Sequence, residues 1–298
     1  MRILTFKNRT FDVVRQISFF APPLKTTLFV SFLGAAAIFG GACTEPGPAR
    51  FSEAKRLGGV MVDAATLNRG QDVYSTYCRT CHGAFGDGKG ALGVYQKPPA
   101  RDLRLGIIKY ASVRAGDLPL DEDLARSIRR GIKGTAMLPI PLRDEEMKPL
   151  IQYLKTFSPR WSKEKAGAAI AIAKDPWTNP TEAAQHGSRI YHLEARCASC
   201  HPAYLDQKEL ASLSPQNRLR LPQREALHRP TTTDSSYGPI QATRLRKAPL
   251  KNGTEPEELY RVIAAGIGGT SMPTWKGALS EKDLWSLVHY IRELRGDS

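Results

Sequence analysis

The chain has 298 residues, which is enough for two domains of modest size that need no disulfide bond to close a core. Its 43 basic and 29 acidic residues give a net charge of +14, a balance that favours acidic protein partners or anionic lipid surfaces. The basic residues are dispersed and no nucleic-acid-binding motif is present, so the composition argues against a nucleic-acid-binding protein.

Residues 1–43 are typical of a targeting segment rather than of the fold. The first 25 residues are positively charged, and residues 26–42 carry no charge and end in small residues, which indicates a secretory signal or a short membrane anchor. Cys43 follows a Gly-Gly-Ala run similar to a permissive lipobox, which makes it a candidate for lipidation. Ordinary cleavage after Ala42 and an uncleaved anchor are the alternatives. All three predict a location on the periplasmic side of a bacterial membrane.

Residues 44–65 contain prolines and a Gly-Gly pair and are interpreted as a tether. From residue 66 onward, apolar side chains recur at intervals of three and four residues, which predicts a helix that leads into Cys78. Two further helices are predicted, over about 124–130 and about 144–157, and Pro149 is expected to distort the early turns of the second.

Residues 159–181 are rich in Ala, Lys and Pro and are interpreted as a linker between two domains, 66–158 and 182–298. After the linker the plan repeats. A helix is predicted over 186–196, a short helix follows within 255–265, and a last helix is predicted over 280–294. Ser280 is expected to cap this last helix, since Asp283 follows three residues later.

Two pentapeptides carry the motif CxxCH, which is typical of covalent attachment of a c-type haem. They contain Cys78, Cys81 and His82 in the first half, and Cys197, Cys200 and His201 in the second. A zinc site built from the four cysteines is disfavoured, because the pairs lie far apart and a ribbon-type site needs a spacing of about 15 to 20 residues. A thioredoxin-like site would not explain why both pairs end in histidine. The sequence therefore predicts two covalently bound haem c groups, each with its iron.

The two halves also repeat beyond these motifs. Gly131 and Gly266 have the same separation along the chain as Met137 and Met272, whereas the cysteines of the two motifs lie closer together. The second half is therefore longer between its histidine and its methionine, and the extra residues are expected within about 202–250. This stretch has six prolines and eight Lys or Arg residues, which predicts an irregular loop over the second haem or a surface for a partner.

On these motifs both halves resemble class I cytochrome c domains, over residues 66–158 and 182–298. The resemblance implies an all-α fold with two tandem domains, each made of a few helices around a covalently attached haem. It also implies that the motif histidine and the loop methionine hold each iron from opposite sides, His82 with Met137 and His201 with Met272. The first helix of each domain should pack against the last.

The second half departs from the pattern of the family at two positions. Pro202 replaces the usual glycine after the histidine, and Gly187 lies two residues further from its cysteine than Gly70 does. We therefore expect the chain around the second haem to follow a different local path, while the haem itself is still bound. The other histidines, including His192 and His228, have no repeated counterpart and are interpreted as surface or packing residues.

The methionine ligands predict electron transfer rather than catalysis. A thioether is a soft, neutral ligand that favours ferrous iron, and two filled axial positions leave no vacancy for a substrate. We expect one-electron transfer in a periplasmic or membrane-associated respiratory chain, from a quinol-oxidising complex or a dehydrogenase to a terminal oxidase or reductase. The alternatives are a di-haem enzyme of the peroxidase or thiosulfate dehydrogenase type, and a fixed cytochrome subunit of a larger oxidoreductase complex. No catalytic residue is predicted.

Overall fold

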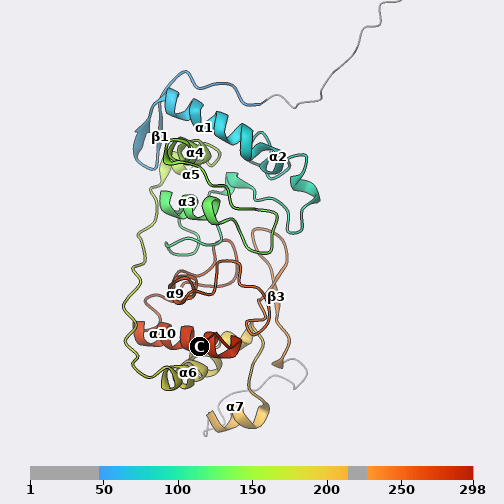
Figure 1. Cartoon of the computed structure of the whole chain (residues 1–298), viewed down its shortest axis with the longest axis vertical. Coiled ribbons are helices and arrows are strands. Elements are labelled where there is room, and N and C mark those ends of the chain that lie inside the picture. The colour runs from blue at the N-terminus through green and yellow to red at the C-terminus, as the bar shows by residue number, and fades with distance from the viewer. Residues whose placement is uncertain (1–46, 214–226, 298) are drawn as a thin grey trace, which may run out of the picture. The chain divides into compact units, whose positions relative to one another are not determined.

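The computed structural model describes residues 47–213 and 227–297. Cys43 and the predicted targeting segment lie outside the described residues, as does part of the predicted insertion. From residue 45 onward the chain forms one compact unit, and its described part is mostly helical, as the resemblance implied (Figure 1). Within that part, no helix combines the length and the apolar character that crossing a bilayer requires.

We call residues 47–163 the first domain. It opens with a hairpin of β1 (Lys55–Leu57) and β2 (Val60–Val62), which pair antiparallel. Its helices are α1 (Ala64–Tyr77), α2 (Arg79–His82), α3 (Asp121–Arg130), α4 (Asp144–Lys155) and α5 (Arg160–Lys163), with single 3₁₀ turns η1 (Gly93–Tyr95) and η2 (Leu103–Leu105). Helix α3 ends before Gly131, whose φ of +63° favours glycine. Pro149 lies inside α4.

We call residues 180–297 the second domain. Its elements are α6 (Pro180–Arg189), the π-turn η3 (Ile190–Glu194), the 3₁₀ turn η4 (Cys197–Ser199), α7 (Gln207–Leu213), strands β3 (Thr232–Thr233) and β4 (Ile240–Gln241), α9 (Pro256–Ala265) and α10 (Glu281–Arg295). Helix α6 begins earlier than predicted, because Asn179 caps it and a proline occupies its first position. Ser280 and Asp283 form the predicted capping box of α10.

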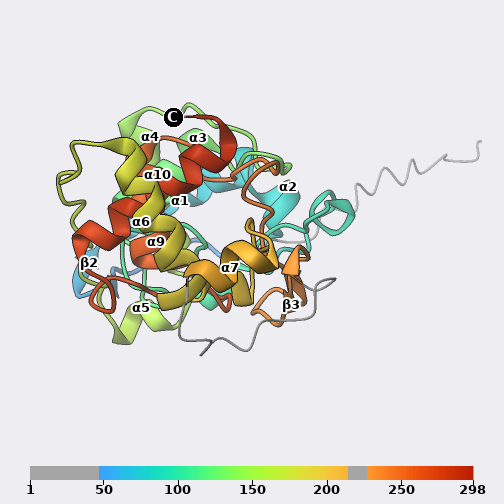
Figure 2. The ribbon, with the colours of Figure 1, turned by 90° about the horizontal axis from the view of Figure 1, so that it is seen from below.

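Each domain is built on a close crossing of its first and last long helices. Helix α1 packs on α4, and α6 packs on α10 (Figures 1 and 2). A Cβ atom added at Gly70 would lie 2.1 Å from the carbonyl oxygen of Pro149, and one added at Gly187 would lie 2.0 Å from that of Ser286. A side chain fits at neither position, so both crossings depend on glycine.

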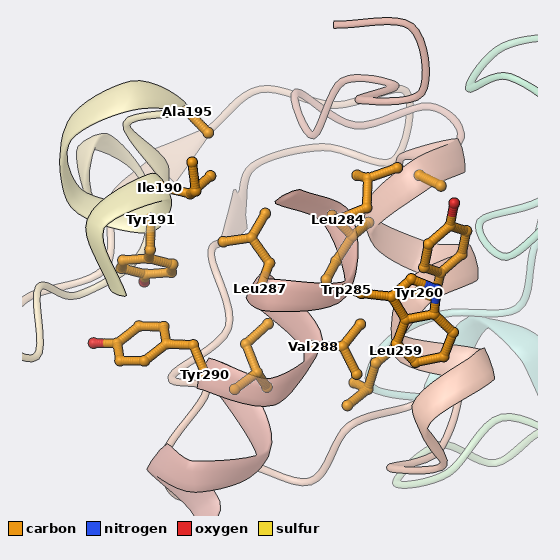
Figure 3. Close-up of a cluster of buried hydrophobic side chains, with 13 residues drawn as sticks. Ile190, Tyr191, Ala195, Leu259, Tyr260, Leu284, Trp285, Leu287, Val288 and Tyr290 are labelled. Atoms are coloured by element: carbon orange, nitrogen blue, oxygen red, sulfur yellow. The ribbon is translucent and has the colours of Figure 1, made fainter. Parts of the chain in front are cut away.

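Buried tyrosines line the same crossings. Tyr74 packs on Tyr153 and Tyr191 packs on Tyr290, each pair with ring centroids 5.4 Å apart. Figure 3 shows Tyr191 facing Tyr290 in the core of the second domain, where α10 contributes a row of buried side chains. The hydroxyl of Tyr74 donates to the carbonyl of Gly83 at 2.7 Å, and the hydroxyl of Tyr191 donates to the carbonyl of Pro202 at 2.9 Å. These bonds tie the helix crossing to the residue after each motif histidine.

The π-turn η3 accommodates the two additional residues between Gly187 and its cysteine. A π-turn takes up extra chain without ending the helix, and Arg196 follows with a left-handed φ of +52°. The helical turn that holds Cys197 is therefore reached from the crossing in spite of the longer path.

Pro202 changes the course of the chain after the second motif. Its counterpart Gly83 has a φ of +81°, which a proline ring cannot adopt. The carbonyl of the second cysteine of each motif nevertheless accepts an amide hydrogen bond. Gly90 donates to Cys81 at 3.2 Å, and Thr231 donates to Cys200 at 2.8 Å, so Gly90 and Thr231 occupy equivalent positions. The longer route to Thr231 contains α7, and the hairpin of β3 and β4 follows. The described part of the insertion therefore includes regular secondary structure where an irregular loop was expected.

The two domains bond to one another along a contact that we call the seam. The first domain contributes Arg101 and residues 107–115 and 130–133, and the second contributes Tyr237, residues 251–269 and Thr274. Glu258, buried in the second domain, pairs with Arg130 of the first at 2.6 Å and with Arg261 of its own at 2.5 Å. Burial alone would raise the pKa of Glu258, but the two guanidinium groups outweigh it and lower the pKa below its usual value.

Residues 164–179 connect the domains without regular secondary structure and yet are bound to both. Ile170 donates through its amide to the carbonyl of Ser112 at 2.7 Å, and Trp285 Nε1 donates to the carbonyl of Ala173 at 2.9 Å. The connection is therefore a packed segment along the surface of both domains.

Replacing Gly70 or Gly187 by alanine should destabilise the protein, by about 3 kcal/mol, because the added methyl meets main-chain atoms of the facing helix. Urea unfolding of the purified protein measures the effect. At an exposed helix position the same change stabilises by about 1 kcal/mol, so a gain in stability would contradict the close crossing.

Replacing Glu258 by glutamine should cost about 2 kcal/mol at pH 7, because two guanidinium groups lose their carboxylate. The pKa of Glu258 is lower in the folded protein, so its contribution is present above about pH 5 and is lost as the pH falls through the folded pKa. The stability gap between wild type and Glu258→Gln should therefore shrink on acidification. Glu257→Gln, at an exposed position in the same turn, is the control. Its stability should equal that of the wild type both at pH 7 and after acidification.

Candidate functional site

The two CxxCH segments form the same compact turn. In the first domain, the amides of Cys81 and His82 donate to the carbonyl of Cys78 at 3.1 and 2.9 Å, and the second motif repeats both bonds at the same distances. One turn therefore holds two thiols and an imidazole together. This turn follows α1 directly in the first domain and is reached from α6 through η3 in the second. This geometry places the predicted attachment residues of each motif side by side.

Each motif histidine is anchored through one ring nitrogen. His82 donates from Nδ1 to the carbonyl of Arg101 at 3.0 Å, and His201 donates from Nδ1 to the carbonyl of Thr243 at 2.9 Å. Such a bond fixes the orientation of the ring and leaves the lone pair on Nε2. Burial lowers the pKa of both imidazoles, which favours the neutral form that a metal requires.

The two methionine loops share one hydrogen-bond pattern. The hydroxyl of Thr135 donates to the carbonyl of Ile132 at 2.8 Å and accepts from the amide of Met137 at 3.1 Å. Thr270 repeats both bonds, at 2.8 Å to Ile267 and at 3.2 Å from Met272. In each loop the carbonyl of the methionine also accepts from the isoleucine amide. The repeated GT-x-Met sequence therefore encodes a repeated, internally bonded loop.

In the second domain the predicted ligands meet at one cavity, whose empty space, counted out into the open solvent at its mouth, is about 780 Å³. Cys197, His201 and Met272 line it, and Trp275 and the core residues Leu287 and Ile291 complete the apolar wall. Cofactor pockets are typically apolar with a few polar groups that fix orientation. In the first domain, Cys78 and Met137 pack against the same buried cluster. An apolar cavity with an imidazole and a thioether on its walls fits a haem.

The cysteines of the two motifs do not come together as a zinc site in the described part of the chain. Burial, reinforced by the second cysteine of each motif, raises the pKa of Cys78 and of Cys197 to about 12, so both are neutral thiols. Across the described residues, His, Cys, Asp and Glu side chains form no group of three or more that could hold a metal ion. Nothing in this geometry supports the zinc alternative.

A cluster of cations lies near the cavity and would match the carboxylates of a haem. The side chains of Arg101, Lys109 and Lys251 form no ion pair with any carboxylate that the structure describes. Burial, with the charges of Arg101 and Lys251, lowers the pKa of Lys109 to about 8. Lys251 also lines the cavity. Burying a cation without a nearby anion raises the free energy of the folded protein. The negatively charged propionates of a haem would offset this cost.

The remaining histidines have structural roles. His192 donates from Nδ1 to the carbonyl of Ser188 at 2.7 Å and accepts on Nε2 from the amide of Tyr204 at 3.3 Å, so both ring nitrogens are occupied. His228 donates from Nδ1 to the carbonyl of Ala203 at 2.9 Å. Neither residue lines the cavity that contains Met272.

Sequence reasoning missed two kinds of site residue. Tyr110 belongs to the first domain and yet lines the cavity of the second, and burial raises its pKa to about 12. The carbonyls of Arg101 and Thr243 orient the histidines. Every residue has a main-chain carbonyl, so the amino-acid sequence does not show which one accepts this bond. The length of chain from histidine to acceptor also differs between the domains, so the repeat by itself did not point to them.

Comparison with known proteins agrees with this geometry. The family model described as cytochrome c oxidase, cbb3-type, subunit III matches residues 65–154 and 182–291. A search of curated proteins gives no match. Among solved structures, a chain of the Kuenenia stuttgartiensis reducing HAO-like protein complex Kustc0457/Kustc0458 is similar, with 26% identity and a TM-score of 0.63 over 76% of this chain and 95% of that chain.

The matched segments fall one in each domain and together cover more than half of the chain. Membership implies covalently bound haem c and electron transfer through it. The protein therefore belongs to the family of cbb3-type cytochrome c oxidase subunit III, with two tandem class I cytochrome c domains.

Proposed function

We propose that this protein is a di-haem cytochrome that carries single electrons on the periplasmic side of a bacterial membrane. A bound haem supplies an iron that alternates between its ferrous and ferric states. The protein attaches one haem through Cys78 and Cys81 and the other through Cys197 and Cys200.

The observation that carries the proposal is that the CxxCH turn and the methionine loop each occur once in both domains. His82 and Met137 would hold one iron, and His201 and Met272 would hold the other. Both imidazoles are oriented by a main-chain carbonyl, and both methionines lie in loops with the same internal bonds. Two closed irons suit electron transfer and offer no position for a substrate.

The partners are redox proteins. We assign a quinol-oxidising complex or a dehydrogenase as donor and a terminal oxidase or reductase as acceptor. A fixed place in a larger oxidoreductase complex is the second candidate, and the similar chain from a complex of Kuenenia stuttgartiensis supports it. Co-purification after mild detergent extraction distinguishes a fixed subunit from a mobile carrier.

A di-haem enzyme of the peroxidase or thiosulfate dehydrogenase type is less well supported. Such an enzyme needs an open iron or an unusual ligand, whereas neither methionine loop is missing or distorted relative to the other. Peroxide turnover by the purified protein would favour the enzyme.

The wild-type protein should carry two haems, show the near-infrared band of methionine-bound ferric haem, and bind no carbon monoxide when reduced. Met137→Ala and Met272→Ala should each open one iron, remove about half of the near-infrared band and lower one of the two midpoint potentials. Met61→Ala, at an exposed position, is the control and should change none of these. Ready binding of carbon monoxide by the wild type would overturn the proposed function.

The membrane attachment is tested at Cys43. If Cys43 carries a lipid, Cys43→Ser should shift the protein from the membrane fraction to the soluble periplasmic fraction, because the acyl chains attached at this cysteine would supply the affinity for the membrane. An uncleaved anchor would leave the variant in the membrane fraction, and simple secretion would leave both forms soluble.

A further inference from the structure

The seam joins the two methionine loops to the opposite domains. The amide of Gly268, in the loop of the second domain, donates to the carbonyl of Lys109 in the first at 3.1 Å. The amide of Lys133, in the loop of the first domain, donates to the carbonyl of Lys251 in the second at 3.2 Å. Each loop is therefore bonded to the partner domain.

The two bonds are equivalent under the repeat of the chain. Lys133 and Gly268 have the same separation along the chain as the two loop methionines. Lys109 and Lys251 have the same separation as Arg101 and Thr243, whose carbonyls orient the histidines. Equivalent positions thus exchange equivalent bonds across the seam, which argues against an incidental contact.

The loop of the second domain is held more tightly than that of the first. The hydroxyl of Tyr237 donates to the carbonyl of Gly268 at 3.3 Å, so both polar groups of this glycine are bonded. The ring of Tyr237 is itself covered by the guanidinium of Arg101 from the first domain, 3.3 Å from the ring centroid. The first domain thus holds Gly268 directly and through Tyr237.

The internal bonds of the loop extend this restraint to the methionine. Ile267 precedes Gly268, and it both donates to the carbonyl of Met272 at 3.2 Å and accepts from the hydroxyl of Thr270 at 2.8 Å. The amide of Met272 in turn donates to the hydroxyl of Thr270. A shift of Gly268 must therefore move Met272 as well.

We propose that the first domain positions the distal ligand of the second haem, with Gly268 and Tyr237 as the positioning residues at the seam. The inference rests on the proposed function, in which Met272 binds iron. The second haem site is then incomplete without the first domain, which also contributes Tyr110 to its cavity. The two haems behave as one unit, because separating the domains opens an iron.

Gly268→Ala tests the proposal directly. The backbone of Gly268 is not left-handed, so alanine is compatible with it, but the added Cβ would lie 2.2 Å from the carbonyl oxygen of Ile108 and 3.0 Å from a side-chain carbon of Ile107. The methyl should push the loop away from the first domain. Gly47→Ala is the matched control, since its Cβ would meet only the far end of the Arg79 side chain, at 3.3 Å.

We expect Gly268→Ala to retain two haems by mass, to lose about half of the near-infrared band of methionine-bound haem, and to bind about one carbon monoxide per chain when reduced. The midpoint that falls should be the one that falls in Met272→Ala. Tyr237→Phe keeps the ring under Arg101 but removes the donor to Gly268, and should lower the same midpoint by a smaller amount. Gly47→Ala should match the wild type in every measurement.

If Gly268→Ala and Tyr237→Phe both keep the full band, bind no carbon monoxide and leave both midpoints unchanged, the inference is wrong. If Gly268→Ala does not accumulate as folded protein, Tyr237→Phe alone decides, and an unchanged midpoint overturns the inference. A wild-type protein without the near-infrared band would instead contradict the proposed function, so the two failures are distinguishable.

Discussion

The hydrogen bond from an imidazole Nδ1 to a main-chain carbonyl is the constraint on which each site depends. It fixes the ring plane, selects the tautomer and directs Nε2 away from the protein backbone. The acceptor lies 19 residues after the histidine in the first domain and 42 residues after it in the second. The bond lengths are nonetheless nearly the same, at 3.0 and 2.9 Å, so the chain between histidine and acceptor varies while the bond is kept.

The second domain differs from the first in the length and path of the chain before and after its CxxCH motif. These differences are tolerated because the hydrogen bonds that hold the motif are kept. The π-turn takes up extra residues before the motif, and the altered path after Pro202 rejoins the pattern at Thr231. The tyrosine at the helix crossing keeps its bond to the residue after the histidine, whether that residue is Gly83 or Pro202. Because that bond uses a carbonyl, which proline retains, the change from glycine alters the route of the chain and not the anchor.

The seam makes the two domains interdependent, although each has its own core. Asp123 and Glu258 are equivalent positions at the start of equivalent helices. Asp123 is satisfied within its domain by Arg126 and Ser112, whereas Glu258 takes a cation from across the seam. The two domains thus keep a carboxylate at the same place in equivalent helices. Only the carboxylate of the second domain helps to join the domains.

The residue pattern alone was enough to predict the fold class, most of the helices, the two attachment motifs and the two methionine loops. These features are local: CxxCH lies within one turn, the GT-x-Met loop bonds to itself, and Ser280 caps its own helix. The two-residue strands of the β3–β4 hairpin were too short for any periodicity to reveal. The three-dimensional arrangement was needed to find which carbonyls orient His82 and His201, that Tyr110 lines the cavity of the other domain, and that Gly268 bonds across the seam. Such contacts join residues that are distant along the chain, and main-chain carbonyls carry no mark in residue identity.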